Sequence, residues 1–135
     1  MSGSDVAVVL DPSAVAAYAR NQVAVGELLT LVADEGRVVG VPATCLAAAY
    51  TRAAGDLEIA LLALLEATPV VRLLPLDKAS TRAAGLTAGR VADGDIALGH
   101  AVTAAYEHGA HYATTDPATA AKVLVAGWSV LDLSE

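Results

Sequence analysis

The stretch Val6-Ala-Val-Val-Leu10-Asp11-Pro12-Ser13 decides the fold. The run from Val6 to Leu10 is almost wholly aliphatic, which favours a central strand of a parallel sheet covered on both faces. Pro12 suits the first turn of a helix, because its missing N–H is no loss there. Asp11 is therefore predicted at the carboxyl end of a strand, where open α/β sheets bind ligands. The alternative is that Asp11 only caps the helix that follows.

The rest of the chain alternates between helix and strand patterns. We expect helices over 13–20, 23–35, 43–54, 57–67, 77–85 or slightly beyond, 96–108 and 118–125, a loop over 90–95, and strands over 6–10, 37–40, 70–74, 110–114 and 127–133. This order predicts a single α/β domain over residues 1–135, a three-layer α/β/α sandwich with a mostly parallel central sheet. Apolar residues nearly encircle the helix between Leu57 and Leu65, so we expect it to be well buried.

Composition narrows the class of protein. The net charge of -7 weighs against nonspecific nucleic-acid binding, but not against a nuclease whose acids gather in one metal pocket. No apolar run approaches the roughly 20 residues that span a bilayer, so no membrane association is expected. Residues 1–5 lack the basic segment that opens a signal peptide. The single cysteine, Cys45, permits no internal disulfide, and together these features predict a cytoplasmic protein.

A second acid repeats the pattern of the first. Asp116-Pro117 follows a predicted strand and precedes a predicted helix, as Asp11-Pro12 does. Two parallel strands that end in this way would place both carboxylates on one edge of the sheet. Like charges repel when they are brought together, unless a cation lies between them. Mg²⁺ is commonly held by one or two carboxylates with water and phosphate, so this edge is a candidate metal site.

In order and spacing, these segments resemble the PIN-domain family, and within it the VapC-like toxins of bacterial toxin–antitoxin pairs. The resemblance covers nearly the whole chain and is carried by four stretches: 8–13 (VVLDPS), 41–48 (VPATCLAA), 70–77 (VVRLLPLD) and 107–116 (EHGAHYATTD). It implies an Mg²⁺- or Mn²⁺-dependent endoribonuclease, in which a metal-bound water attacks an RNA phosphodiester. It also implies an antitoxin protein and a second copy of the chain as partners.

The resemblance assigns roles to particular residues. Asp11 matches the first acid of the family's quartet, Asp116 matches the fourth, and Thr114 matches a hydroxyl position beside the metal. Ser13 either caps the first helix or binds a metal-bound water. Together with Thr114, it is a candidate for substrate binding.

The two middle acids of the family are not matched. The family's Glu is expected where the chain has Ala48, and its third acid is expected at Leu98. Asp95 lies one turn before Leu98 on nearly the same helix face, so we take it as the third catalytic acid and metal ligand, with Asp93 as a weaker candidate. Two missing acids predict a degenerate site, with weak divalent binding and slow or absent RNA cleavage.

Basic residues outside the acid positions are further candidates, and a second class of function fits the same fold. Arg82 and Arg90 are the best candidates for an RNA-facing rim, whereas His100 is expected to pack within a helix interface or lie on the surface. A different class of function keeps the PIN scaffold as a non-catalytic module for dimerisation or regulation. A phosphate-accepting receiver domain is disfavoured, because no acidic pair precedes the end of the strand at Asp11.

Overall fold

A parallel five-stranded sheet runs through the molecule in the order β3-β2-β1-β4-β5. The computed structural model describes residues 4–135. Residues 1–3, where part of the signal-peptide expectation falls, lie outside the described residues. The strands are β1 (Val6–Leu10), β2 (Val38–Pro42), β3 (Val71–Leu74), β4 (His111–Thr114) and β5 (Val130–Asp132).

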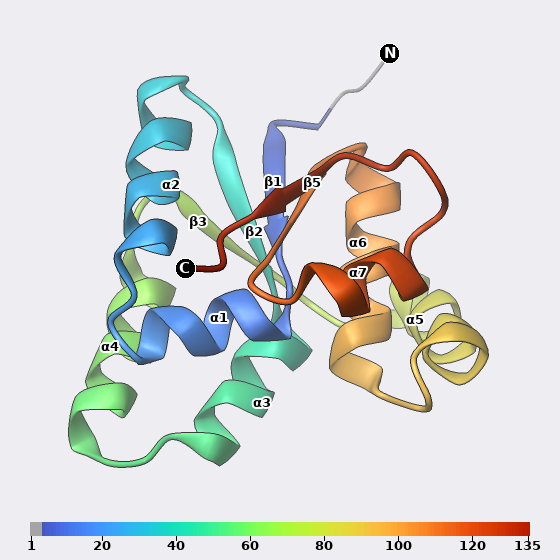
Figure 1. The fold of residues 1–135 in the computed structure, drawn as a ribbon, viewed down its shortest axis with the longest axis horizontal. Coiled ribbons are helices and arrows are strands. Elements are labelled where there is room, and N and C mark those ends of the chain that lie inside the picture. Colours follow the sequence, from blue (N-terminus) through green and yellow to red (C-terminus); the bar gives the residue numbers. More distant parts are fainter. Residues whose placement is uncertain (1–3) are drawn as a thin grey trace.

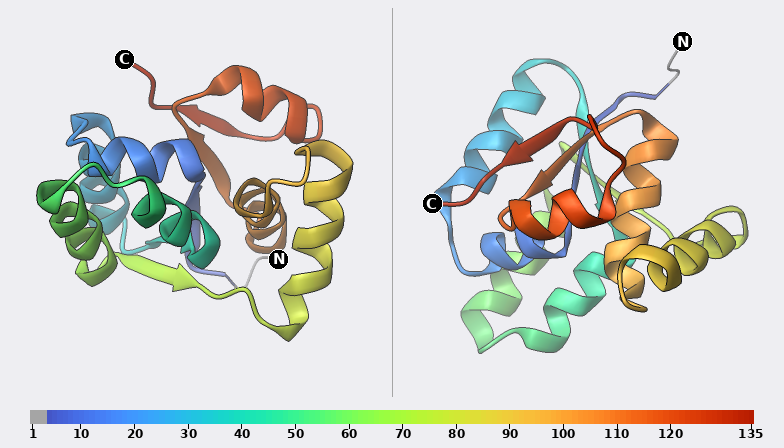
Figure 2. Two further views of the ribbon diagram at one scale, coloured as in Figure 1. Left: turned by 90° about the horizontal axis from the view of Figure 1, so that it is seen from below. Right: turned by 45° about the vertical axis from the view of Figure 1, so that its right-hand side comes forward.

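Seven helices connect these strands within the described residues. They are α1 (Pro12–Ala19), α2 (Val23–Asp34), α3 (Ala43–Arg52), α4 (Asp56–Ala67), α5 (Lys78–Val91), α6 (Ile96–His108) and α7 (Pro117–Val123). Helices α1 to α4 gather on one side of the central strands, and α5 and α6 lie on the other (Figures 1 and 2). The predicted three-layer α/β/α architecture is confirmed, and the sheet is wholly parallel rather than mostly so.

The core is built on β1, as its aliphatic sequence predicts. All five residues of β1 are buried, and it lies at the centre of the sheet between β2 and β4. A parallel strand at this position has both faces covered by helices, which explains why it carries no polar residue. Because β1 ends at Leu10, Asp11 lies directly after this buried strand, at the carboxyl edge of the sheet. None of the helices described over residues 4–135 is long and apolar enough to cross a membrane.

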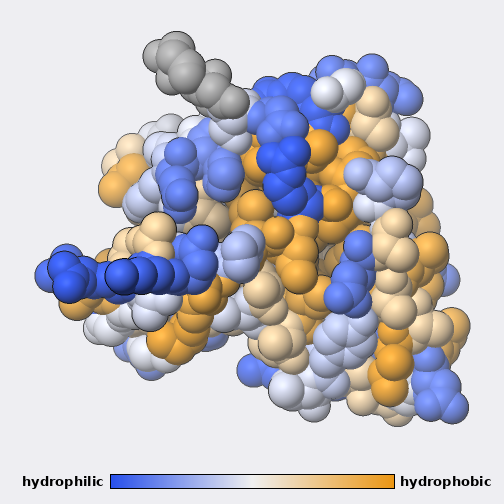
Figure 3. All heavy atoms as spheres, turned by 180° about the vertical axis from the view of Figure 1, so that it is seen from behind, coloured by the Kyte–Doolittle hydropathy of each residue, from blue (hydrophilic) through white to orange (hydrophobic). Residues whose placement is uncertain are grey.

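The prediction that the helix over 57–67 is well buried was wrong. Only Leu62 and Leu65 of α4 are buried, while Leu57 is 70% exposed and Leu64 is 54% exposed. Helix α4 packs against α1, α3 and β3 from one side, so the rest of its apolar circumference faces outward. Hydrophobic residues also gather in the middle of the rear face of the molecule (Figure 3).

The end of α5 also differs from the prediction. The helix continues to Val91, so Arg90 lies in its last turn rather than in a loop. Its start is the capping box between Asp77 and Ser80, as the expected cap at Asp77 requires. The helix runs past Gly85 because Ala84 and Ala88, one turn apart, are buried against α6. This tertiary contact outweighs the low helix propensity of glycine.

The contact between α5 and α6 depends on Gly99. A Cβ atom at this position would lie 2.5 Å from the Ala84 carbonyl oxygen and 2.8 Å from the Ala88 Cβ. Such distances are shorter than atoms tolerate, so only glycine lets the two helices approach this closely. Gly99 has a packing role, one residue after the position where the family's third acid is expected.

The remaining boundaries differ from the predictions by a few residues. Helix α1 begins at Pro12 rather than residue 13, and α7 ends at Val123 rather than residue 125. Strand β5 covers only Val130–Asp132, because Gly127 forms a turn with a positive φ of 84° before it. Gly109 ends α6 in the left-handed conformation, as expected of a glycine at a helix C-terminus.

Candidate functional site

A pocket of about 390 Å³ opens where β1 and β4 end. It brings together the three acids that were singled out in the sequence, each from a different connection: Asp11 follows β1, Asp95 precedes α6 and Asp116 follows β4. The pocket, called the edge pocket below, is lined by Asp11, Pro12, Ser13, Ala16, Arg20, Arg52, Asp95, Leu98, Asp116 and Thr119. It lies at the carboxyl edge of the sheet, the usual ligand-binding place of open α/β folds.

Asp11 is buried at the inner wall of this pocket and caps α1. One carboxylate oxygen, Oδ1, accepts hydrogen bonds from the Ser13 hydroxyl at 2.6 Å and from the Ala14 N–H at 2.9 Å. The residue is only 3% exposed. Burial raises the pKa of Asp11, while hydrogen bonds from Ser13, Thr114 and Ala14 act in the opposite direction. The capping role considered from the sequence is therefore present, inside the pocket wall.

A chain of hydroxyl groups joins Asp11 to the end of β4. The Ser13 Oγ lies 3.1 Å from the Thr114 Oγ1 and accepts a hydrogen bond from the Thr115 N–H at 2.9 Å. The Thr114 hydroxyl in turn accepts from the Asp116 N–H at 2.9 Å. Ser13 and Thr114 thus hold two distant segments together. Contact with a metal or with substrate stays a prediction for both residues.

The other two acids are also helix caps. Both carboxylate oxygens of Asp116 accept hydrogen bonds from Thr119, from its N–H at 3.2 Å and from its hydroxyl at 2.6 Å. These bonds lower the pKa of Asp116. Asp95 accepts from the Leu98 N–H at 3.1 Å, which confirms its predicted cap on α6. Each of the three acids therefore has a structural task that is independent of any ligand.

Tyr112 is a functional candidate that sequence reasoning missed. Its side chain is fully buried, and its hydroxyl has no hydrogen-bond partner among residues 4–135. Burial and the nearby charge of Asp11 raise the Tyr112 pKa, although the two groups do not reach hydrogen-bond geometry. The signal was its position two residues before Thr114, which places both side chains on the same face of β4.

The donor set does not match the quartet of acids that the family resemblance implies. No group of three or more His, Cys, Asp or Glu within residues 4–135 is arranged to hold a metal ion. One oxygen of Asp11 and both oxygens of Asp116 are already engaged in hydrogen bonds. Ala48 and Leu98 offer no ligand atoms at the other two positions. Binding of Mg²⁺ or Mn²⁺ at this pocket stays a prediction.

Two arginines that the sequence reading did not select line the edge pocket. Arg20 is the C-cap residue directly after α1, and Arg52 is the last residue of α3. Their spacing was a usable signal, because Arg20 lies seven residues after Ser13, and Arg52 lies four after Ala48, on the same helix faces. The predicted rim residues Arg82 and Arg90 both lie on α5 and do not line this pocket, so their contact with RNA stays a prediction.

The remaining histidine and cysteine candidates have packing roles. His100 is 2% exposed, and its Nδ1 lies 2.8 Å from the Thr44 hydroxyl, which joins α6 to α3. Cys45 is buried and donates to the Ala97 carbonyl oxygen at 3.3 Å. Asp93 lies in the turn before α6 with a positive φ of 51° and does not line the edge pocket.

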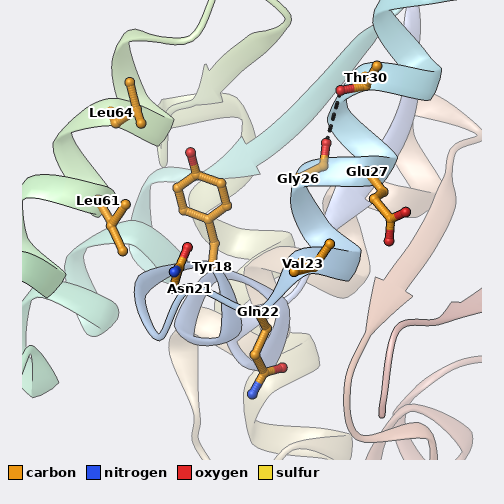
Figure 4. A pocket seen from close by; sticks show the side chains of 9 residues that line it. All are labelled: Tyr18, Asn21, Gln22, Val23, Gly26, Glu27, Thr30, Leu61 and Leu64. Carbon is orange, nitrogen blue, oxygen red and sulfur yellow. Dashed lines mark hydrogen bonds between the residues drawn. The ribbon is translucent and has the colours of Figure 1, made fainter.

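A second cavity, of about 400 Å³, lies between the turn from α1 to α2 and helix α4. Figure 4 shows Tyr18 between Leu61 and Leu64 on one side and the start of α2 on the other. Val23, at its rim, is 67% exposed. This cavity, called the α2–α4 groove below, is largely apolar and holds none of the three acids of the edge pocket.

Comparison with known proteins adds no family assignment. The chain matches no protein-family model and no curated protein. The resemblance to PIN domains therefore stays a prediction from the sequence.

Proposed function

We propose that the chain is a VapC-like PIN-domain protein of the endoribonuclease type, which acts on RNA at the edge pocket and whose metal-assisted hydrolysis is weak or lost. The observation that carries the proposal is the meeting of Asp11, Asp95 and Asp116 in one pocket at the carboxyl edge of the sheet. Three acids from three separate connections line this pocket, and titratable groups gathered in a pocket at the carboxyl edge of an α/β sheet are candidates for a reactive site.

The geometry also supports weak rather than full activity. Asp11 and Asp116 both use carboxylate oxygens to cap helices. Ala48 and Leu98 supply no further metal ligands. Loss of a partner that only supports a metal ligand already lowers metal affinity by about 10–100-fold. We place the protein in the cytoplasm, in keeping with the single thiol of Cys45, which is buried and unpaired.

An RNA cleavage assay with Mn²⁺ tests this proposal. It compares the chain with the double variant Ala48→Glu/Leu98→Asp, which restores both absent acids. The matched control is Ala48→Gln/Leu98→Asn, which has nearly the same shape and no added charge. We expect cleavage by the acid variant only. Comparable cleavage by the unmodified chain would contradict the loss of activity, and a folded but inactive acid variant would contradict the nuclease assignment.

A second candidate function is a non-catalytic scaffold that associates with a second copy of itself. It is favoured by the α2–α4 groove and by the exposed apolar residues Val23 and Leu64 that line it. Clustered exposed apolar residues are typical of association surfaces. Sedimentation analysis should show a dimer that Leu64→Arg converts to a monomer, whereas Leu86→Arg on α5 should not. A chain that is monomeric at all concentrations would exclude this candidate. An antitoxin as partner stays a prediction from the family resemblance.

A further inference from the structure

We propose that Arg20 and Arg52 form a phosphate clamp, a pair of guanidinium groups that binds phosphate groups of RNA at the edge pocket without a metal ion. The proposal rests on the proposed function, because RNA is the ligand which that function supplies. It assigns to these two residues the binding role that the sequence reading gave to Arg82 and Arg90.

The two arginines come from helices that pack against each other. Helices α1 and α3 are in contact, and both arginines line the same pocket. On α1, Ser13, Ala16 and Arg20 lie on one face that leads from the buried Asp11 outward. The small Ala16 side chain leaves the space between Asp11 and Arg20 open. A phosphate at this place would lie beside the acids and against the guanidinium groups.

Neither guanidinium is neutralised within the described chain. The ion pair present among residues 4–135 joins Arg72 to Asp5 at 2.5 Å, on exposed side chains. Arg20 and Arg52 form no ion pair and no side-chain hydrogen bond with the described residues. Their N–H donors therefore remain available to a ligand. Guanidinium groups bind phosphate through paired, charge-assisted hydrogen bonds, which is why arginine is favoured at phosphate sites.

Ala48 offers Arg52 no charged partner one turn before it on α3. Residues 48 and 52 are one turn apart on α3, and acid–base pairs at this spacing attract each other. A Glu at position 48 would face Arg52 and compete with a phosphate for it. Ala48, which supplies no metal ligand, therefore also leaves the Arg52 guanidinium available to an anion. The edge pocket thus holds two of the eight Lys and Arg residues of the chain, beside the carboxyl groups of Asp11, Asp95 and Asp116.

Both arginines also lie at helix C-termini, where a cation is stabilised by the helix dipole. That role would require no ligand. It predicts that removing either arginine lowers the stability of the fold and leaves RNA binding unchanged. The clamp predicts that removing either arginine weakens RNA binding and leaves the stability of the fold unchanged.

The test is binding of a fluorescent single-stranded RNA, followed by anisotropy in EDTA over a series of salt concentrations. Arg20→Gln and Arg52→Gln are each expected to weaken binding about tenfold, the loss of one charge-assisted interaction. Each should also lower the slope of log K against log salt by about 0.7, the value for one phosphate contact on a single strand. Lys78→Gln, which removes a charge at the start of α5, is the matched control. Ala48→Glu should weaken binding as Arg52→Gln does.

The outcomes separate the clamp from the proposed function. Equal losses with Lys78→Gln, or losses with Arg82→Gln and Arg90→Gln instead, would overturn the clamp. If the unmodified chain binds no RNA in EDTA while the Ala48→Glu/Leu98→Asp variant cleaves it, the clamp is wrong and the nuclease assignment holds. Inorganic phosphate serves as the competitor: if it binds through both arginines while RNA does not, the RNA assignment is overturned. Thermal melting of each variant shows whether the fold is intact.

Discussion

The two halves of the sheet's carboxyl edge differ in whether the strand ends in an acid that caps the next helix. At β1 and β4, the strand ends in an acid that caps the next helix, Asp11 for α1 and Asp116 for α7. At β2, the strand runs through Pro42 into α3, which has no side-chain cap. The acid expected farther along α3 is replaced by Ala48, and Arg52 follows one turn later.

This difference shows which acids a fold keeps for its own stability. Replacing a capping Asp by Ala typically costs about 0.5–2 kcal/mol. Replacing Glu by Ala inside a helix costs almost nothing in propensity, because both residues are strong helix formers. A capping acid such as Asp11 therefore has a structural reason to stay even without a ligand. An acid at position 48 would cap no helix, and its structural role would be limited to a pair with Arg52 one turn later.

The largest expected effect belongs to Asp11→Ala. The change removes the buried acceptor of the Ala14 N–H and of the Ser13 hydroxyl, and the hydroxyl chain to Thr114 loses its anchor. We expect the free energy of unfolding to fall by about 3 kcal/mol, from a lost cap and unsatisfied buried donors together. Urea denaturation measures this loss. A cost below about 1 kcal/mol would show that the acid half of the edge is not held by its caps.

A smaller loss is expected for Asp95→Ala, which removes an exposed cap from α6. We expect the free energy of unfolding to fall by about 1 kcal/mol. The loss is small because the N–H that Asp95 caps is exposed and can bond to water instead. Asp95→Ser, which keeps a capping oxygen, should recover most of the stability in the same urea titration. Equal losses in the two variants would mean that Asp95 acts through its charge instead.

On the other half of the edge, Ala48→Glu should change the free energy of unfolding by less than about 1 kcal/mol, because Glu and Ala have similar helix propensities. Ala48 is half-buried beside the core, so part of the longer side chain can reach solvent. Comparing the free energies of unfolding of Ala48→Glu and Ala48→Gln by chemical denaturation isolates the effect of the charge. A fall in the free energy of unfolding as large as that of Asp11→Ala would show that Ala48 has a packing role. The two halves of the edge would then not differ in how they depend on these residues.

The finest test is the pH dependence of Asp11→Asn. Since burial raises the Asp11 pKa in the folded protein, the folded chain binds this proton more tightly than the unfolded chain does. The contribution of this group to stability is therefore greatest in acid and falls as pH rises through the folded pKa. Asn does not titrate. The free energy of unfolding of the variant should therefore rise relative to that of the unmodified chain between pH 4 and pH 8. A difference in unfolding free energy that is constant over this range would contradict the shift.

The sequence predicted the architecture because period and composition are local properties. The aliphatic run of β1 and the two Asp-Pro pairs were sufficient to place two acids on one edge of a parallel sheet. The exposure of Leu57 and the full length of α5 were not predictable in this way. They depend on which side of a helix meets a neighbour, and that contact is made by residues far away in the chain.

The arginines of the edge pocket show the same limit at the site. Arg82 and Arg90 were preferred to Arg20 and Arg52 in the sequence, although only the latter two continue the helix faces of Ser13 and Ala48. Packing of α1 against α3 makes the distinction. The sequence places Tyr112 on the same face of β4 as Thr114, but the unpaired state of its buried hydroxyl follows from the packing around β4.

The close contact of α5 with α6 has a consequence for how the molecule opens. Helix α5 buries only Ala84 and Ala88, so little apolar surface holds it in place, whereas every residue of β1 is buried. Amide hydrogens of α5 should therefore exchange with solvent through a local detachment of that helix, at a small fraction of the global unfolding free energy. Those of β1 should exchange only when the whole sheet comes apart. A mass-spectrometric exchange profile would show α5 as the first helix to become labelled and the Asp11 edge among the last segments.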